Sequence, residues 1–386
     1  MNQRSSDKII LHLSLIPGIG PATIKIIIEQ MPSVFALGRL RPDGAEELAD
    51  LYSMKVPELC ELGLTYDRAT KIVAGLQDTS ILDKELELIA KYNIGWTVLG
   101  SPEYSSLLAE IEQPPAVIYY QGQNLFYSDK ALAFVGSRKS DAYARVIVDK
   151  LVPQLVQDNW IIVSGGALGV DSLTHDQVVR SGGKTIVVLG SGLLNWYPAS
   201  NSGLFNKVIQ SGGMIVSCFS LQTQPIAANF PARNRIIAGL SQGTVVVQAA
   251  SKSGALITAD FALEQGRQVF AVPGSIEHGL HDGCHYLIQQ GAKLVTNVHD
   301  IVIEFGYGVQ SAQDSADKQL SLPMEISTSP ISKQDAVILE KLLQPRSTDE
   351  LLSRLDIPLE DLMQKLFDLS LEGKISQDMM GLWKRI

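Results

Sequence analysis

The middle of the chain alternates short apolar runs, rich in β-branched residues, with segments of helix length. The runs are apolar throughout rather than at every second residue, which is typical of strands buried on both faces of a parallel sheet. They occupy residues 131–136, 160–164, 185–190, 213–218, 243–249 and 268–274. Helices are expected between them, at 143–156, 170–180 and 254–265. This order predicts an α/β fold with helices on both faces of a parallel sheet.

The residues before this region are expected to be helical. Residues 1–80 have a helical pattern, and "IPGIGPATI" (16–24) has a tight turn with Pro21 placed to begin the next helix. Residues 81–130 lead into the sheet with a short strand, a helix and another strand. We therefore expect a small all-α domain at 1–80, followed by a sheet domain at 81–306.

The C-terminal part has a different composition. Residues 307–330 are polar and without periodicity, as in a linker. Residues 331–386 predict three amphipathic helices and then a hairpin with Gly381 at its turn, which is the order of a winged helix. Ser347 and Glu350 have the spacing of a capping box for the second helix. The helices are expected at 335–343, 347–355 and 359–373.

Other features restrict the class of protein. No apolar run approaches the ~20 residues that span a bilayer, so no membrane partner is expected. The N-terminus lacks the layout of a signal peptide. The 3 cysteines cannot all pair, which favours a reducing compartment over a disulfide framework. The expected location is cytoplasmic.

The charge is unevenly distributed. The net charge is −9, yet residues 130–300 contain 13 Lys/Arg against 10 Asp/Glu. No acidic residue occurs between Asp176 and Asp260, whereas six basic residues do: Arg180, Lys184, Lys207, Arg233, Arg235 and Lys252. Burial in a sheet explains the missing acids but not the retained bases. We therefore favour an anion as the partner of this window.

Three loops could hold that anion. "VGSRKS" (135–140) follows the first strand of the sheet and has a turn glycine, a hydroxyl and two cations at a helix start; it is either a phosphate site or a basic cap on an exposed turn. "VSGGALGVD" (163–171) has glycines that allow close approach to a ligand. "ANFPARNRIIAG" (228–239) has two arginines where a loop enters a helix.

Catalytic and metal sites are disfavoured. Ser164, Asp171 and His175 lie in one short segment, and the G-x-S-x-G of a nucleophile elbow is absent. "LGSGLLNWYP" (189–198) resembles a dinucleotide-binding turn, but the acidic residue expected about 20 positions later is missing. "EHGLHDGCH" (277–285) fits no standard zinc spacing. We expect no catalytic residues, no metal and no cofactor.

The motif series resembles the DNA-processing protein A (DprA/Smf) family. The segments that match it, in order, are "VGSR" (135–138), "VSGGALGVD…TH" (163–175), "VVLGSGL…YP" (187–198), "NFPARNRIIAGLS" (229–241) and "SGALITADFALEQGRQVFAVPG" (253–274). The resemblance implies a Rossmann-like core, an N-terminal helix-hairpin-helix (SAM-like) domain and a C-terminal winged helix. It also implies a dimeric, non-enzymatic binder of single-stranded DNA that loads the recombinase RecA during natural transformation.

The resemblance also implies which residues bind DNA. Arg233 and Arg235 would either neutralise phosphates or lock the pocket wall, while Phe230 would stack on a base or pack the loop. The implied set is Gly136, Ser137, Arg138, Lys139, Ser164, Gly165, Gly166, Phe230, Arg233, Asn234, Arg235 and Lys252.

The chain departs from the family pattern at three positions. Cys218 and Gln248 stand where members commonly have Glu, and Ala199 replaces a frequent Lys. The competing hypothesis is an enzyme that binds or hydrolyses nucleotides. Such enzymes usually have a catalytic Glu near a glycine-rich loop, where this chain has "SKSGALIT" (251–258). The hairpin at 16–24 could face either DNA or protein, and acidic neighbours of Lys365 and Lys374 favour a protein-facing winged helix.

Overall fold

The chain divides into two units, Met1–Tyr307 and Gly308–Ile386. The computed structural model describes residues 5–36, 47–128, 130–307, 333–342, 344–355, 357–371, 374–377 and 382–385. The expected linker at 307–330 lies outside these residues, apart from Tyr307. Each unit is described by itself below.

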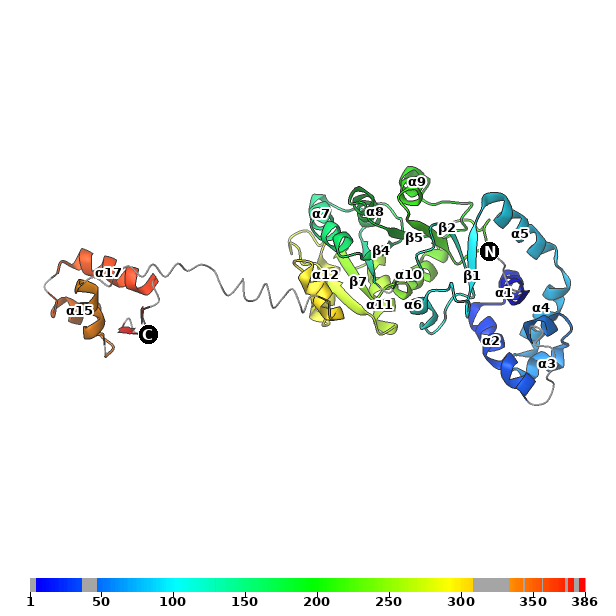
Figure 1. Cartoon of the computed structure of the whole chain (residues 1–386), viewed down its shortest axis with the longest axis horizontal. Coiled ribbons are helices and arrows are strands. Elements are labelled where there is room, and N and C mark those ends of the chain that lie inside the picture. The colour runs from blue at the N-terminus through cyan, green and yellow to red at the C-terminus, as the bar shows by residue number, and fades with distance from the viewer. Residues whose placement is uncertain are drawn as a thin grey trace. The chain divides into compact units, whose positions relative to one another are not determined.

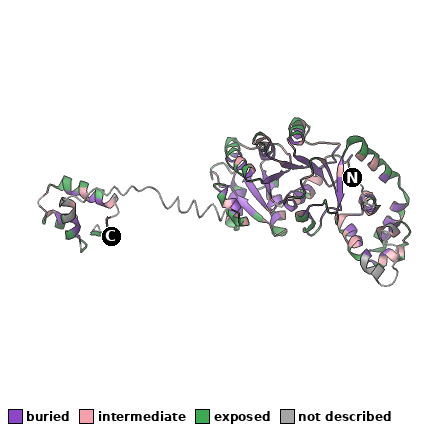
Figure 2. Cartoon of the chain, in the orientation of Figure 1, coloured by how far each residue is buried: buried purple, intermediate pink, exposed green. Residues whose placement is uncertain are grey.

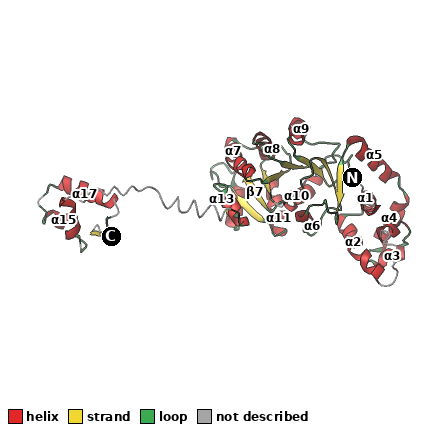
Figure 3. Ribbon diagram, in the orientation of Figure 1, coloured by secondary structure: helices red, strands yellow, loops and turns green. Residues whose placement is uncertain are grey.

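Within its described residues, the first unit contains a nine-stranded sheet of order β1-β2-β6-β5-β4-β3-β7-β8-β9. Figure 3 shows its strands in yellow among the red helices. The strands from β6 through β5, β4, β3, β7 and β8 to β9 are parallel to one another. Strand β2 pairs antiparallel with both β1 and β6. The six strands expected from the apolar runs are confirmed as β3 to β8. The bounds are β1 Gly95–Val98, β2 Val117–Gly122, β3 Ala131–Gly136, β4 Ile161–Ser164, β5 Thr185–Val188, β6 Met214–Ser217, β7 Gly243–Gln248, β8 Gln268–Ala271 and β9 Lys293–Leu294.

The chain reverses its direction across the sheet between β3 and β7. From β3 it adds β4, β5 and β6 on one side, and then returns to pair β7 with the other side of β3. Two neighbouring parallel strands therefore send their following loops apart, which opens a crevice at their carboxyl ends. In open α/β sheets this is the usual place for a ligand.

Helices cover both faces of the sheet, as Figure 1 shows with α7, α8 and α9 on one side and α10 and α11 on the other. Alternate residues of each strand enter different cores: Phe134 packs with α7 and α8, and Val135 packs with α10, α11 and α12. Strands β4, β5, β6 and β7 are accordingly buried at every residue (Figure 2), whereas the edge strand β9 is exposed. The helices are α6 Ser106–Ala109, α7 Ala142–Gln157, α8 Val170–Arg180, α9 Ser202–Gln210, α10 Asn229–Gly239, α11 Gly254–Glu264, α12 Asp282–Gln289 and α13 His299–Val302, with 3-10 turns at Ala199–Asn201 and Ile303–Phe305.

The N-terminal helices share a core with the sheet. Leu13 of α1 and Val187 of β5 belong to one continuous cluster of buried residues. The buried carboxylate of Glu85 also accepts a hydrogen bond from the backbone N–H of Leu221, at 2.8 Å. The helical region runs beyond residue 80, because α5 ends at Tyr92. The bounds are α1 Ser5–Leu15, α2 Pro21–Ala36, a 3-10 helix Glu47–Tyr52, α3 Val56–Glu61, α4 Tyr66–Gln77 and α5 Ser80–Tyr92.

In its described residues, the second unit contains three helices and a two-stranded antiparallel sheet. The capping box at the start of α16 is confirmed, since Ser347 and Glu350 bond each other's backbone N–H groups. The expected turn residue Gly381 lies outside the described residues. The elements are α15 Lys333–Lys341, α16 Thr348–Leu352, α17 Leu359–Leu371, β10 Ile375–Gln377 and β11 Trp383–Arg385. Throughout the described part of the chain, no helix is both long and apolar enough to cross a membrane.

The shared core predicts that the N-terminal helices and the sheet unfold together. Leu13→Ala removes a side chain that is 0% exposed and should cost about 2–5 kcal/mol, lowering the stability of β5 and β6 as well as that of α1. Hydrogen exchange measured in increasing denaturant tests this. Leu263→Ala, at a position 55% exposed, is the matched control and should change stability by less than about 0.5 kcal/mol. Earlier exchange of α1 alone would contradict the prediction.

Candidate functional site

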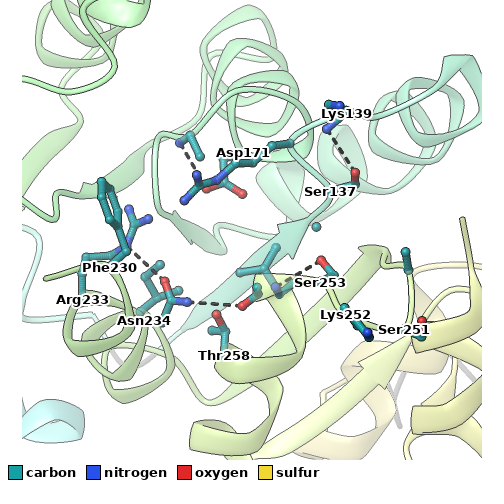
Figure 4. Close-up of a pocket in the computed structure, with 18 residues that line it drawn as sticks. Ser137, Lys139, Asp171, Phe230, Arg233, Asn234, Ser251, Lys252, Ser253 and Thr258 are labelled. Atoms are coloured by element: carbon teal, nitrogen blue, oxygen red, sulfur yellow. Dashed lines mark hydrogen bonds between the residues drawn. The ribbon is translucent and has the colours of Figure 1, made fainter. Parts of the chain in front are cut away.

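A cavity of about 540 Å³ lies at the carboxyl ends of β3 and β7, the two neighbouring strands between which the chain reverses its direction across the sheet (Figure 4). We call it the main cavity. Its walls come from the loops that follow β3, β4 and β7, from α10, and from the first turns of α8 and α11. The lining residues are Val135, Gly136, Ser137, Arg138, Lys139, Ala167, Asp171, Phe230, Arg233, Asn234, Ile237, Ala250, Ser251, Lys252, Ser253, Gly254, Ala255 and Thr258.

Backbone hydrogen bonds hold the loops after β3 and β4 against each other. The N–H of Ser137 donates to the carbonyl of Gln248 at 2.8 Å, and the carbonyl of Ser137 accepts from the N–H of Val170 at 3.1 Å. Gly169 has a φ of +80°, and a Cβ atom there would collide with the backbone of Ser137 and Arg138. Glycine at this position is therefore needed both for its conformation and for the close approach of the two loops.

Arg233 forms part of the wall rather than the open surface. Its side chain is buried, and Nη1 donates hydrogen bonds to the carbonyl oxygens of Gly165 and, at 2.6 Å, of Val188. Gly165 directly follows β4 and Val188 is the last residue of β5, so the guanidinium links both strands to α10. Burial lowers the pKa of Arg233 to about 10, an effect opposed by the charge of Asp171, and the group remains a cation at neutral pH.

Asp171 is the acidic partner of this buried cation. Desolvation raises the pKa of its carboxyl group, whereas Arg233 and the N–H of Ala167, which donates to Oδ2 at 3.2 Å, act in the opposite direction. Burying one charge is costly unless another compensates it. The opposite charges of Arg233 and Asp171 therefore partly compensate each other in the wall of the cavity.

The cations available to a ligand are at the rim. Arg138, Lys139 and Lys252 line the cavity and are exposed. Of the charged side chains that line it, four are cationic (these three and Arg233) and one, Asp171, is acidic. Because an exposed guanidinium and two ammonium groups surround the opening, the cavity is suited to an anion with several charges.

Phe230 provides an aromatic surface beside these cations. The Cζ atom of Arg138 lies 5.4 Å from the centre of the ring and that of Arg233 lies 5.8 Å away. The ring of Tyr197 is 5.7 Å from it, centre to centre. A smaller hollow of about 60 Å³ continues from the main cavity past Phe230, between Leu168, Tyr197 and Pro198. The site thus combines charge with aromatic and apolar surface.

The structure brings together eight of the predicted site residues in the main cavity: Gly136, Ser137, Arg138, Lys139, Phe230, Arg233, Asn234 and Lys252. Asn234 donates from Nδ2 to the carbonyl of Gly254 at 3.3 Å, which connects α10 to the loop after β7. Sequence reasoning omitted Ala167, Ser251, Ser253, Thr258 and Tyr197. The Tyr-Pro pair at 197–198 was the available signal for Tyr197.

The other four predicted residues lie elsewhere. Ser164 is buried and donates to the carbonyl of Phe134 at 2.6 Å. Gly166 has a φ of +67° and its carbonyl accepts from Nδ2 of Asn201 at 2.8 Å, so both residues shape the wall from behind. Gly165 lines the smaller hollow. Arg235 lines a different cavity, on another side of α10.

The disfavoured catalytic and metal sites have other structural roles. His175 is fully buried, with Nδ1 2.8 Å from Oγ1 of Thr185, and burial together with the charge of Arg233 lowers its pKa to about 3. In the 277–285 segment, His281 lies against Gln248 and Tyr143, and His285 contacts the carbonyl of Gly274. Within the described ranges of the chain, no three His, Cys, Asp or Glu side chains are grouped to hold a metal ion.

The role assigned to Arg233 makes a prediction about stability. Arg233→Ala should cost about 3–5 kcal/mol, because Asp171 would remain as an uncompensated buried charge and two carbonyl groups would lose their donor. Chemical denaturation measures the loss. The double variant Arg233→Ala/Asp171→Asn should recover part of it, whereas Arg138→Ala, at the exposed rim, should change stability little. Equal stability of Arg233→Ala and the wild type would contradict the assignment.

Comparison with known proteins supports the family resemblance. The family model of DNA recombination-mediator protein A matches residues 96–306. The chain is 44% identical over 200 residues to the DNA processing protein DprA of Streptococcus pneumoniae, covering 52% of this chain and 70% of that one. It is 35% identical over 276 residues to the protein Smf of Escherichia coli, covering 70% and 71%.

A solved structure agrees with these relatives. The X-ray structure of DprA from Streptococcus pneumoniae matches with a TM-score of 0.65 at 33% identity, covering 79% of this chain and 99% of that chain. The resemblance drawn from the motifs is thereby confirmed. The chain belongs to the DNA recombination-mediator protein A family, that of DprA and Smf.

Proposed function

We propose that the main cavity binds the backbone of single-stranded DNA, and that the protein protects such strands and delivers them to the recombinase RecA. The observation that carries the proposal is the set of exposed cations Arg138, Lys139 and Lys252 around a cavity whose one acidic lining residue, Asp171, is buried and offset by the charge of Arg233. A phosphodiester chain satisfies several separate cations at once, which a single small anion does less well.

The lining residues would divide the work. Arg138, Lys139 and Lys252 contact phosphates. Gly136, Ser137 and the loop after β4, whose Gly165 carbonyl is bonded to Arg233, let the DNA strand approach the protein backbone. Phe230 offers its face to a base, and Arg233 and Asn234 hold the wall in place. Ser164, Gly165 and Gly166 contribute by supporting that wall. Charge and stacking together are how sequence-tolerant single-strand binders work.

A single strand suits the site better than a duplex. The ring of Phe230 is inside the cavity, next to the apolar hollow formed by Leu168, Tyr197 and Pro198. Bases reach such surfaces only when they are unpaired and unstacked. A duplex presents phosphates to a protein but keeps its base faces covered.

We propose further that the protein is not an enzyme. A nucleotide hydrolase needs a general base close to the ligand, and among the lining residues the carboxylate is that of Asp171, which is buried and already accepts a hydrogen bond from the N–H of Ala167. His175 is buried and neutral. A mononucleotide would fit a cavity of about 540 Å³, so the alternative of a nucleotide-binding enzyme is tested below.

The remaining parts of the chain complete the proposal. The sequence places a helix-hairpin-helix (SAM-like) domain at 1–80, the Rossmann-like DNA-binding domain at 81–306, a linker at 307–330 and a winged helix at 331–386; we propose this order of domains, with the first boundary moved to the end of α5 at Tyr92. We also propose a homodimer, RecA as partner and a cytoplasmic location, as the family resemblance implies. The helix order α15, α16, α17 followed by β10 and β11 supports the winged helix.

Fluorescence anisotropy of labelled oligo-dT, titrated at several salt concentrations, tests single-strand binding. Arg138→Gln and Lys252→Gln should each weaken binding and reduce the slope of log K against log salt by about 0.7, because one phosphate contact is lost. Phe230→Ala should cost about 1–3 kcal/mol of binding free energy through lost stacking. Arg180→Gln, in the last turn of α8, is the matched control and should bind like the wild type.

The same titration separates the alternatives. Unlabelled single strands should displace the probe at far lower concentration than duplex DNA or mononucleotides. Displacement by a mononucleotide alone, or multiple-turnover hydrolysis of a nucleotide that Arg138→Gln abolishes, would replace the DNA proposal with a nucleotide enzyme.

Delivery to RecA has its own test. On a strand already coated with a single-strand-binding protein, the wild type should accelerate assembly of RecA filaments, and Arg138→Gln should lose that acceleration because it no longer holds the strand. Strand binding without any acceleration would limit the protein to protection of DNA.

A further inference from the structure

A second cavity, of about 270 Å³, lies between the N-terminal helices and the sheet. We call it the rear cavity. Its walls come from α1 and the turn before α2, from β2, from the segment after β6 and from α10, all within the first unit. The lining residues are Ser14, Leu15, Ile19, Pro21, Ile24, Pro115, Ala116, Val117, Tyr119, Cys218, Phe219, Ser220, Ala232 and Arg235.

Arg235 is the charged side chain among these lining residues. Its Nη1 lies 3.5 Å from Oε1 of Gln113, at the limit of a hydrogen bond, and no carboxylate of the described residues is within ion-pair distance of it. The hydroxyls of Ser14 and Ser220 already bond Leu11 and Thr223. Burial raises the pKa of the Cys218 thiol to about 11, so it is neutral. The cavity is therefore apolar with one uncompensated cation.

Helix α10 separates the rear cavity from the main cavity. Successive residues of an α-helix are about 100° apart, so Arg233 and Arg235 point about 200° apart around its axis. Phe230, Arg233 and Asn234 line the main cavity, whereas Ala232 and Arg235 line the rear one. One short helix thus supplies a cation to each of two cavities.

We propose that the rear cavity is a second nucleotide subsite for the same DNA strand, in which a base enters the apolar space and Arg235 contacts its phosphate. This inference rests on the proposed function of the main cavity. A strand longer than the main cavity would cross the N-terminal end of α10 to reach it.

Three observations favour a nucleotide over other occupants. The segment from residue 177 to residue 259, which includes α10, contains no acidic side chain that would repel the phosphodiester chain as it crosses this helix. Phe219, which is half-buried, provides aromatic surface in the cavity. The volume, about 270 Å³, falls just below the ~300 Å³ at which drug-sized ligand pockets begin, which suits one base.

A further cation lies beyond Arg235. Lys25 of α2 donates from Nζ to the carbonyl of Glu112 at 3.3 Å, next to the Gln113 that Arg235 contacts. Its charge is shared with Glu29, whose carboxylate is 3.9 Å away. The cations Arg138, Arg235 and Lys25 would lead the DNA strand from the main cavity toward the N-terminal helices.

A length series of oligo-dT, from about 4 to about 16 nucleotides, tests the subsite. Arg235→Gln should leave the shortest strands that bind unaffected, weaken the longer ones, and lower their salt slope by about 0.7, the loss of one phosphate contact. Arg180→Gln is the matched control. Equal weakening at every length, or no weakening at any length, would overturn the second subsite. If Arg138→Gln still weakened every length, the proposed function would stand without it.

A second variant tests the apolar space directly. Ala232→Phe places a ring in the rear cavity while keeping Arg235. Strands with 2-aminopurine at successive positions should show one position, outside those that contact the main cavity, whose fluorescence changes on binding to the wild type and not to Ala232→Phe. Identical profiles for the two proteins would overturn the proposal. The circular dichroism spectrum and the affinity for the shortest strand confirm that the variant is folded.

Discussion

The buried guanidinium of Arg233 bonds the carbonyl ends of two strands, and the geometry of the main cavity depends on this contact. Without a donor, the carbonyl oxygens of Gly165 and Val188 would be left buried and unsatisfied, and the loop after β4 would lose its anchor to α10. The charge has its own requirement, since a cation in this position needs Asp171 nearby. Arg233, which the sequence makes a candidate ligand contact, thus serves mainly to hold the wall of the cavity together.

This division leaves the exposed cations free to bind. Arg138, Lys139 and Lys252 come from loops after β3 and β7, which separate because the chain reverses direction between these strands. Main-chain bonds of Ser137 to Gln248 and Val170 fix the relative positions of the loops without using side chains. Rigid loops of this kind reduce the conformational entropy lost when a ligand binds, which raises affinity.

Much of the sheet could be predicted from the sequence, because strands buried on both faces must be apolar throughout. The position of β2 could not: its antiparallel pairing with β6 depends on which sheet edge is open, and no local pattern encodes that. The cavity followed from the rule that ligands bind at the carboxyl ends of strands. The different roles of Arg233 and Arg235 did not follow, because their spacing puts them on opposite sides of a helix but does not say which side faces the sheet. Likewise, Ser164 and Gly166 lie in a glycine-rich loop of the expected type. Local sequence does not distinguish the residues of such a loop that line a cavity from those that support its wall from behind.

The acidic character of the whole chain is compatible with the proposed DNA site and would give that site specificity. Outside the window between Asp176 and Asp260, acidic residues outnumber basic ones in both the N-terminal and the C-terminal segments. Surfaces of like charge repel a polyanion, so a strand is attracted only where carboxylates are missing. The cations inside the window are divided in the same way: Arg233 is buried in the wall near the carboxylate of Asp171, while Lys252 and Arg235 remain available. An acidic protein can therefore bind a nucleic acid in a defined groove while its remaining surface discourages nonspecific adhesion to the same polymer.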